Sequence, residues 1–362
     1  MKGLTISEID KNFEVKSENY KDTRYFDALD EPFSLYGVFY ENGAYRRLPE
    51  SVAKEVSVGV HALHTHTAGG RIRFRTNSSR IAIHVESDYI YSARHITDIG
   101  ASGIDVYCEI DGKYRFAGTY HNHKQDFGHE GLITLAGPKQ EREIMIHMPN
   151  YSNVVNFYIG LENGSTLDHG KKYLPGKPIV YYGSSITQGG CASRPGNAYT
   201  HIISINNNRD FINLGFSGSG RGEEIMAKHI ASLEMSAFVM DYDWNAPTPE
   251  HLEATHEKLV RAYRAAHPDT PIIVVSRPDY SAERAEYDSW RAEDERRRMI
   301  VRATYEKLTA EGDALIGYVD GAHIFDGEYR DSCTVDGCHP SDLGFSRMAK
   351  RIGDEIEKFL KR

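Results

Sequence analysis

The chain has 362 residues, of which 40% are hydrophobic and 26% are charged, a composition typical of a soluble globular protein. Its formal net charge of -9 argues against binding of nucleic acid or of an anionic membrane through a broad basic face. No apolar run approaches the roughly 18 residues of a membrane-spanning helix. We therefore expect neither nucleic acid nor a membrane as a partner.

The N-terminus, MKGLTISEIDKNFEV, lacks the apolar segment of a secretory signal, so we expect a cytoplasmic location. The four cysteines are too few and too scattered for a disulfide framework, and free thiols are expected. The length of the chain suggests two domains. Homo-oligomerisation is compatible with the sequence but is not decided by it.

Short runs of alternating apolar and polar residues, separated by turn residues, fill the chain up to about residue 170. This pattern is typical of antiparallel strands. The clearest runs are RIRFRT (71–76), IAIHVES (81–87), IDVYCEIDG (104–112), YRFAGTYHN (114–122), REIMIHM (142–148) and VVNFYIGL (154–161). We therefore predict an antiparallel β-sandwich, similar to a jelly roll, as an N-terminal domain over residues 1–173.

A stretch rich in glycine, proline and lysine (161–178) marks the predicted boundary to a second domain, residues 174–362. Apolar strands alternate with helical patterns beyond it. The strands are PIVYYG (178–183), FINLGF (211–216), AFVMDY (237–242), PIIVVS (271–276) and LIGYVD (315–320). Such alternation predicts an α/β domain in which helices cover both faces of a parallel sheet.

Four segments that follow predicted strands carry residues suited to catalysis. In the first, Gly183-Ser184-Ser185, a strand that ends in glycine places a serine hydroxyl at the carboxyl edge of the sheet. If a helix follows, its N-terminal amides can face a developing oxyanion. Taken alone, the segment could also be an ordinary polar turn.

The second segment, residues 213–222, is a glycine-rich loop that exposes backbone amides, among them that of Gly218. A dinucleotide-binding loop is excluded by spacing, because Glu223 stands where the third glycine is required. In the third segment, Asn245 follows a strand, where its side-chain amide can donate a hydrogen bond to an oxyanion. An ordinary turn asparagine is the alternative.

The fourth segment, Asp336-Gly-Cys-His339, leads into the last predicted helix. A carboxylate three residues before a histidine can hold one imidazole nitrogen, while the other nitrogen accepts a proton from serine. A chance pairing in a loop is the alternative for this segment alone. The order, spacing and strand placement of all four segments argue against coincidence.

Together the four segments resemble the sequence blocks of the GDSL/SGNH hydrolases, over residues 178–362. The resemblance implies a three-layer SGNH-hydrolase domain with a parallel sheet. It also implies Ser185 as the nucleophile and His339, oriented by Asp336, as the general base. The oxyanion hole would comprise Ser185, Gly218 and Asn245. Neither a cofactor nor a metal is expected.

Two departures from the family pattern are visible. Gly183-Ser184-Ser185 replaces the usual Gly-Asp-Ser, which leaves the mechanism intact because the replaced acid is not part of the triad. The segment 243–246, Asp-Trp-Asn-Ala, replaces the usual Gly-x-Asn-Asp. Trp244 is therefore expected to line the substrate site, and Ala246 lacks a carboxylate that often braces the asparagine.

The N-terminal part also resembles the β-domain of a bacterial subgroup of this family, since residues 103–107, GIDVY, are similar to its Gly-x-Asp-Leu-Tyr signature. Several carbohydrate esterases combine a β-sandwich with such a catalytic domain. By this analogy we expect an esterase that removes O-acetyl groups from a small-molecule or oligosaccharide ester. The alternatives are a lipase or thioesterase, an acyltransferase with the same triad, and a non-catalytic glycan-binding protein.

Other residues allow both a functional and a structural interpretation. Gln188 and Arg194 follow the expected nucleophile and are candidates for substrate contact or for a plain structural role. Tyr280 and Trp290, in a predicted polar loop, could form a substrate lid or lie in a solvated loop. The run ERRRM (295–299) is expected on the exposed face of a charged helix.

Histidine pairs and two cysteines are further candidates for metal binding or for reactive groups. The histidine pairs 64/66 and 121/123 have the spacing of metal ligands, but no set of cysteines or carboxylates accompanies them, so surface or packed histidines are expected. Cys191 and Cys338 could lie near the site as nucleophiles, although small core-lining residues are the favoured interpretation.

Overall fold

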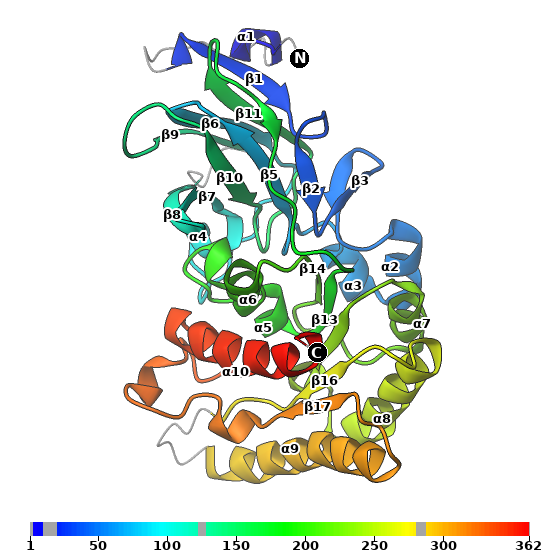
Figure 1. Ribbon diagram of the computed structural model, residues 1–362. Helices are drawn as coiled ribbons and strands as arrows, with labels where there is room; N and C mark the ends of the chain where they lie inside the picture. The colour runs from blue at the N-terminus through cyan, green and yellow to red at the C-terminus, as the bar shows by residue number, and fades with distance from the viewer. Residues whose placement is uncertain (1–2, 10–19, 122–127, 280–286, 362) are drawn as a thin grey trace. The chain divides into compact units, whose positions relative to one another are not determined.

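The computed structural model describes residues 3–9, 20–121, 128–279 and 287–361 (Figure 1). Contacts divide the chain into two compact units. The first unit comprises Met1–Arg46, Thr65–Tyr173 and Arg194–Gly196, and the second comprises Arg47–His64, Leu174–Ser193 and Asn197–Arg362. The expected division into two domains, residues 1–173 and 174–362, stays a prediction.

The first unit consists mainly of strands. They are β1 Thr23–Asp27, β2 Ser34–Tyr36, β3 Phe39–Glu41, β4 Ala44–Arg46, β5 Arg71–Thr76, β6 Arg80–Glu86, β7 Ile104–Ile110, β8 Lys113–Tyr120, β9 Gly128–Thr134, β10 Arg142–His147, β11 Asn156–Glu162 and β12 Asp168–His169. Two short helices, α1 (Ile6–Ile9) and α4 (Asp98–Ser102), accompany them. One sheet has the order β1-β11-β6-β9, and the other has the order β12-β5-β10-β7-β8 with β2 beside β5.

Alternate side chains of the two sheets share one core. Ile72 and Phe74 on β5 belong to the same buried cluster as Ile81 and Ile83 on β6, and all four are fully buried. Because side chains of a strand alternate between its faces, period-2 sequences let each sheet turn an apolar face toward the other. All pairings within the two sheets are antiparallel, which confirms the predicted β-sandwich.

The second unit alternates strands and helices. They are α2 Glu50–Val56, α3 Val58–Leu63, β13 Ile179–Gly183, α5 Ser185–Gln188, α6 Tyr199–Asn207, β14 Phe211–Gly215, α7 Glu224–Ser232, β15 Ala237–Asp241, α8 Pro249–Ala266, β16 Ile272–Val275, α9 Tyr287–Ala310, β17 Ile316–Val319 and α10 Asp342–Leu360. Single 3-10 turns are η2 Pro195–Asn197, η3 Asp243–Asn245, η4 Gly321–His323 and η5 Arg330–Ser332. The five strands form one parallel sheet in the order β14-β13-β15-β16-β17.

Helices cover both faces of this sheet (Figure 1). Tyr182 of β13 packs in a core that includes residues of α7, α8 and α9, while its neighbour Tyr181 packs in the core with α6 and α10. Ala53 of α2 and Val60 of α3 also belong to the first of these cores. The predicted three-layer α/β architecture is therefore confirmed.

Two expectations about α9 are wrong. The helix begins at Tyr287, so Trp290 lies in its first turns and not in a loop. Within the ERRRM run, Arg297 and Arg298 are buried, with exposed fractions of 4% and 8%. Arg297 tolerates burial because its guanidinium donates to the carbonyl oxygens of Asp243 and Ala246, at 3.1 and 2.8 Å. Tyr280, the other lid candidate, lies outside the described residues.

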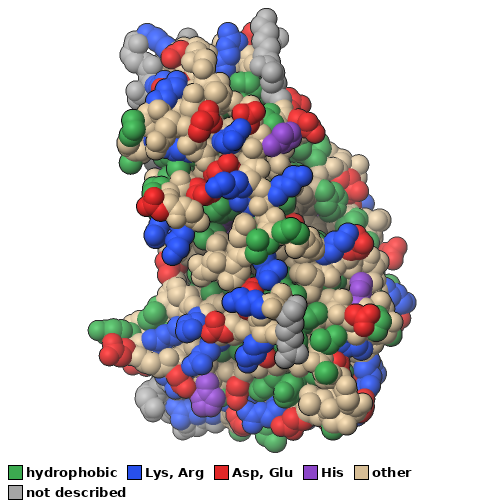
Figure 2. All heavy atoms as spheres, in the orientation of Figure 1, with side chains coloured by type: hydrophobic (Ala, Val, Ile, Leu, Met, Phe, Trp, Pro, Cys, Tyr) green, Lys and Arg blue, Asp and Glu red, His purple; other side chains and the backbone are tan. Residues whose placement is uncertain are grey.

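In the described segments, no helix combines the length and apolarity needed to cross a membrane. Figure 2 shows basic and acidic side chains interspersed over the face that it draws.

Candidate functional site

The strand order gathers the predicted site residues of the second unit. Because β13 lies between β14 and β15, the loops that leave the carboxyl ends of these three strands adjoin one another. Ser185 follows β13, Gly218 follows β14 and Asn245 follows β15. The loop that carries Asp336 and His339 precedes α10.

A tight turn between β13 and α5 sets the position of Ser185. A Cβ atom on Gly183 would lie 2.0 Å from Thr187 Oγ1 and 2.3 Å from the carbonyl oxygen of Asp241, so glycine is needed there. Ser184 is the N-cap of α5, and its Oγ accepts a hydrogen bond from the backbone N–H of Ile186 at 3.1 Å. The two adjacent serines therefore have different environments.

Ser185, His339 and Asp336 form a hydrogen-bonded series. Ser185 Oγ lies 2.9 Å from His339 Nε2, and His339 Nδ1 lies 2.8 Å from Asp336 Oδ2. Both distances are within hydrogen-bonding range. Asp336 Oδ1 also accepts hydrogen bonds from the backbone N–H groups of His339 and Cys338, at 2.7 and 2.9 Å.

The charge state of Asp336 determines which ring nitrogen of His339 carries hydrogen. Burial by itself would raise the pKa of the Asp336 carboxyl, but the hydrogen bonds and charge of His339 and the N–H of Cys338 lower the pKa overall. An ionised carboxylate only accepts hydrogen bonds, so Nδ1 of His339 must donate to it. Nε2 of the neutral ring is then an acceptor that faces the hydroxyl of Ser185.

Gly218 and Asn245 follow β14 and β15, the two strands that flank β13. Gly218 has a φ of +66°, a left-handed conformation that favours glycine, and Arg221 donates from Nε and Nη2 to its carbonyl oxygen at 3.1 and 2.9 Å. Asn245 Nδ2 donates one hydrogen to the carbonyl oxygen of Phe216 at 2.8 Å. This carbonyl braces the asparagine in place of the carboxylate that Ala246 lacks, and the amide keeps a second N–H.

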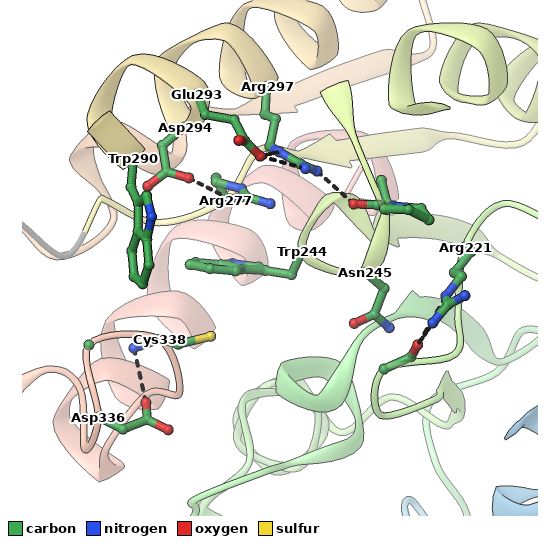
Figure 3. A pocket seen from close by; sticks show the side chains of 14 residues that line it. Arg221, Trp244, Asn245, Arg277, Trp290, Glu293, Asp294, Arg297, Asp336 and Cys338 are labelled. Atoms are coloured by element: carbon green, nitrogen blue, oxygen red, sulfur yellow. Dashed lines mark hydrogen bonds and ion pairs between the residues drawn. The ribbon is translucent and has the colours of Figure 1, made fainter. Parts of the chain in front are cut away.

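A cavity of about 490 Å³ opens beside these donors (Figure 3). Its volume is in the range of small-molecule sites. The lining residues are Gly218, Arg221, Trp244, Asn245, Ala246, Pro247, Arg277, Trp290, Glu293, Asp294, Arg297, Asp336, Gly337 and Cys338. Trp244 is among them, and its contact with a substrate stays a prediction.

Arg277 fixes the wall formed by Trp244. Its guanidinium carbon lies 4.1 Å from the indole centroid, and its Nη1 donates to Asp294 at 2.5 Å. The carboxylate of Asp243 accepts from the backbone N–H of Arg277 at 2.9 Å. Burial raises the pKa of the Asp243 carboxyl, and the charge of Arg277 opposes that rise.

The sequence interpretation did not single out Arg277. Arg277 directly follows the predicted strand PIIVVS. Ser185 also follows a predicted strand closely, so the same criterion would have identified Arg277 as a candidate. Its stacking on Trp244 could not have been found, because the two residues are 33 positions apart in the chain.

Gln188 and Arg194 have structural contacts. Gln188 is fully buried, and its Oε1 accepts a hydrogen bond from the backbone N–H of Ser217 at 3.0 Å. Arg194 belongs to the first unit, where its Nη1 donates to the buried carboxylate of Asp105 at 3.0 Å. These contacts favour the structural alternative for both residues, and substrate contact stays a prediction.

The signature residues of the β-domain explain the placement of Arg194. Asp105 also accepts from the backbone N–H of Gly196 at 2.7 Å and from Thr119 Oγ1 at 2.5 Å. Tyr107 Oη lies 2.5 Å from Arg194 Nη1. The aspartate and tyrosine of the signature thus both bind residues of the segment 194–196.

The thiols near the site are poor nucleophiles. Burial, with a smaller contribution from the charge of Asp336, raises the pKa of Cys191 and of Cys338 to about 12 in each case. Both residues therefore stay protonated at neutral pH, as expected for small core-lining side chains.

The described histidines that could serve as metal ligands have other contacts. Cys191 Sγ lies within 4.8 Å of the ligand atoms of Asp336 and His339, but both ring nitrogens of His339 already have hydrogen-bond partners. His64 Nδ1 faces the carbonyl oxygen of His61, and His66 stacks on Tyr89 with ring centroids 5.6 Å apart. His123 lies outside the described residues.

Two models of known protein families match the chain. The model of the GDSL-like lipase/acylhydrolase family matches residues 176–357. A second model, GxDLY, described as the N-terminus of SGNH-hydrolase-type esterases, matches residues 23–167. A search of curated proteins finds no significant match.

Several solved structures share the fold over almost the whole chain. A protein of Bacteroides ovatus described as a GDSL-like lipase is 30% identical, with a TM-score of 0.83 over 94% of this chain and 98% of that chain. A salicylyl-acyltransferase from a tetracycline biosynthetic pathway is 20% identical (TM-score 0.74; 93% and 98%). A family two carbohydrate esterase from Clostridium thermocellum, in complex with cellohexaose, is 13% identical (TM-score 0.59; 91% and 99%).

Proposed function

The chain belongs to the GDSL-like lipase/acylhydrolase family, and from this premise we propose that it hydrolyses carboxylic esters with Ser185 as the nucleophile. The observation that carries the proposal is the series from Ser185 Oγ through the imidazole of His339 to Asp336, with distances of 2.9 and 2.8 Å. A serine, a histidine base and a carboxylate in this order form an activated nucleophile.

The reaction proceeds in two halves. His339 Nε2 accepts the hydroxyl proton of Ser185 while Oγ forms a bond to the ester carbonyl carbon. The bond from that carbon to the alcohol oxygen then breaks, and Nε2 returns the proton to the departing alcohol. In the second half, the same nitrogen takes a proton from water, and the water oxygen forms a bond to the acyl carbon. The bond from that carbon to Ser185 Oγ then breaks, the acid leaves, and Nε2 returns the proton to Oγ. Asp336 stays ionised and holds the ring throughout.

The negative oxygen of the tetrahedral intermediate needs fixed donors. The backbone N–H groups of Ser185 and Gly218 and the second N–H of the Asn245 side chain are the candidates. The brace from Phe216 orients the Asn245 amide before substrate arrives, so little reorganisation is needed in the transition state.

The favoured substrate is a short-chain ester, an O-acetyl group on a sugar or oligosaccharide. Two considerations support this choice. Solved structures with the same fold include one named a carbohydrate esterase and one named an acetyl xylan esterase. In addition, the cavity wall combines two indoles with several charged side chains instead of a long apolar channel. A wide apolar pocket would favour a lipase or thioesterase.

Hydrolysis of 4-nitrophenyl esters of increasing chain length tests the proposal. Wild type should hydrolyse acetate faster than butyrate, and Ser185→Ala should lose nearly all turnover while keeping its circular dichroism spectrum. Ser184→Ala is the matched control, because it removes the N-cap of α5 and leaves the nucleophile. If Ser185→Ala keeps most of its ester turnover, the assignment is wrong.

Product analysis separates hydrolysis from acyl transfer. Acetylated xylobiose is incubated with the enzyme and an excess of a non-acetylated saccharide acceptor. Free acetate as the main product supports the hydrolase, whereas acetyl transfer to the acceptor would make the protein an acyltransferase with the same triad. Sugar binding without turnover by wild type would favour a glycan-binding protein.

A further inference from the structure

The cavity beside the proposed site contains every tryptophan of the chain. The sequence has two tryptophans, and both Trp244 and Trp290 line this cavity. They come from separate elements, η3 after β15 and the first turns of α9. Figure 3 shows the two indoles on one side of the cavity, close to the segment that carries Asp336 and Cys338.

The two indoles differ in how firmly they are held. Trp244 is half-buried and lies under the guanidinium of Arg277, which is itself paired with Asp294. Trp290 is 53% exposed, an unusual state for so large an apolar side chain. Trp244 therefore provides a rigid aromatic surface, and Trp290 provides a second surface that a ligand could cover.

The charges around the cavity are balanced. Three arginines and three carboxylates line it: Arg221, Arg277, Arg297, Glu293, Asp294 and Asp336. Arg277 pairs with Asp294 at 2.5 Å, and Arg297 pairs with Glu293 at 2.7 Å. A ligand with a net charge would have to compete with these pairs, whereas an uncharged ligand can exchange hydrogen bonds with them.

A ligand of this cavity must contact both the two indoles and the charged side chains that line it. An acyl chain or an aryl ring would cover the indoles but would remove water from the arginines and carboxylates without replacing its hydrogen bonds. A pyranose ring has C–H groups on its faces, which suit the electron-rich face of an indole, and hydroxyl groups at its edge. A cavity of about 490 Å³ also exceeds the space needed for an acetyl group alone.

We propose that this cavity binds an uncharged pyranose ring of the substrate alcohol, with Trp244 as the fixed contact surface and Trp290 as the residue that determines specificity. The proposal rests on the proposed esterase function, because the cavity adjoins the donors Gly218 and Asn245. Sugar binding and ester hydrolysis are nevertheless separate measurements.

Tryptophan fluorescence tests the proposal directly, since both fluorophores of the chain lie in the cavity. Ser185→Ala protein is titrated with neutral mono- and disaccharides of the gluco, galacto, manno and xylo configurations, and with glucuronic acid, salicylate and butyrate. We expect a saturable change with at least one neutral saccharide. Trp290→Ala in the same background should weaken that binding about tenfold, with Trp244 as the reporter.

Met299→Ala is the matched control, because Met299 is an exposed residue of the same helix that does not line the cavity. In active protein, Trp290→Ala should raise KM for an acetylated saccharide about tenfold, whereas Met299→Ala should leave that KM unchanged. A structural defect would instead lower the thermal unfolding midpoint of the variant.

The outcomes separate this inference from the proposed function. If no neutral saccharide changes the fluorescence, or if salicylate, butyrate or glucuronic acid binds more tightly than every neutral sugar, the inference is wrong even where Ser185→Ala abolishes esterase activity. If neutral saccharides bind and wild type hydrolyses no ester, the inference holds and the proposed function is wrong.

Discussion

Asp336 holds His339 at two points. Its Oδ2 lies 2.8 Å from the ring nitrogen Nδ1, and its Oδ1 accepts a hydrogen bond from the backbone N–H of the same histidine at 2.7 Å. A spacing of three residues permits this because the loop turns back on the carboxylate. The orientation of the ring is therefore set both through its own nitrogen and through its main chain.

Asp336→Asn should nearly abolish turnover without unfolding the protein. The asparagine side chain can donate to Nδ1, which would place the ring hydrogen on Nε2 and leave no acceptor for the proton of Ser185. We expect kcat on 4-nitrophenyl acetate to fall by about 10³–10⁴, as for other triads with this change, with KM changed little. A loss smaller than about tenfold would contradict the assigned tautomer.

Asn245→Ala tests the oxyanion hole. The change removes the side-chain N–H expected to face the oxyanion, and it also leaves the carbonyl oxygen of Phe216 without its 2.8 Å donor. Removal of one such donor should lower kcat by about 10²–10³, with KM nearly unchanged. The thermal unfolding midpoint of the variant is the control, since a large drop in stability would assign the effect to the lost brace.

The hydrogen-bonded series of Ser185, His339 and Asp336 could be predicted from the sequence because each of its members depends on local chain features. Ser185 follows a strand of apolar residues, and Asp336 and His339 share one loop. The alternation of short strands likewise predicted the β-sandwich, because period 2 is a local pattern.

Residues whose position depends on distant partners could not be predicted. The sequence pattern predicts an exposed Arg297, but this side chain is buried against carbonyl groups about 50 positions earlier in the chain. The helices α2 and α3 belong to the second unit although they lie in the N-terminal half. They are too short for a clear amphipathic pattern, and only the packing of Ala53 and Val60 reveals their place.

Asp241→Asn should make stability less dependent on pH. Asp241 is buried at the end of β15, where burial and then the nearby charge of Asp243 raise the pKa of its carboxyl well above 3.8. Hydrogen bonds from Thr187 and Tyr199, at 3.3 and 3.4 Å, only partly oppose this rise. The folded protein thus retains a proton that the unfolded chain releases as pH rises above 3.8.

The sign of the effect follows from proton uptake. Between the unfolded and the folded pKa values, the folded state binds more protons, so this group lowers stability as pH increases. The asparagine variant has no such proton, and its urea midpoint relative to wild type should be higher at about pH 7.5 than at about pH 4.5. If the difference between the urea midpoints of the variant and wild type is the same at both pH values, Asp241 is ionised in the folded protein.

Arg194→Met should destabilise the protein through Asp105. The Asp105 side chain has no exposed area, and burial raises the pKa of its carboxyl, while Arg194 at 3.0 Å, Thr119 and the N–H of Gly196 lower it. Removal of the arginine leaves a buried carboxylate without its counter-charge, a loss that typically costs about 3–5 kcal/mol. Urea unfolding of the full chain measures this change in the free energy of unfolding.

The double variant Arg194→Met, Asp105→Asn separates loss of the ion pair from loss of packing. Asparagine keeps one oxygen that can accept from the N–H of Gly196, its NH2 group can donate to Thr119 Oγ1, and it carries no charge that needs Arg194. The double variant should therefore be more stable than Arg194→Met alone, with a coupling energy above about 1 kcal/mol. If the unfolding free energies lost in Arg194→Met and in Asp105→Asn add up to the loss in the double variant, the ion pair contributes little. The effect of Arg194 would then come from its guanidinium, which stacks on Phe116 at 3.9 Å from the ring centroid.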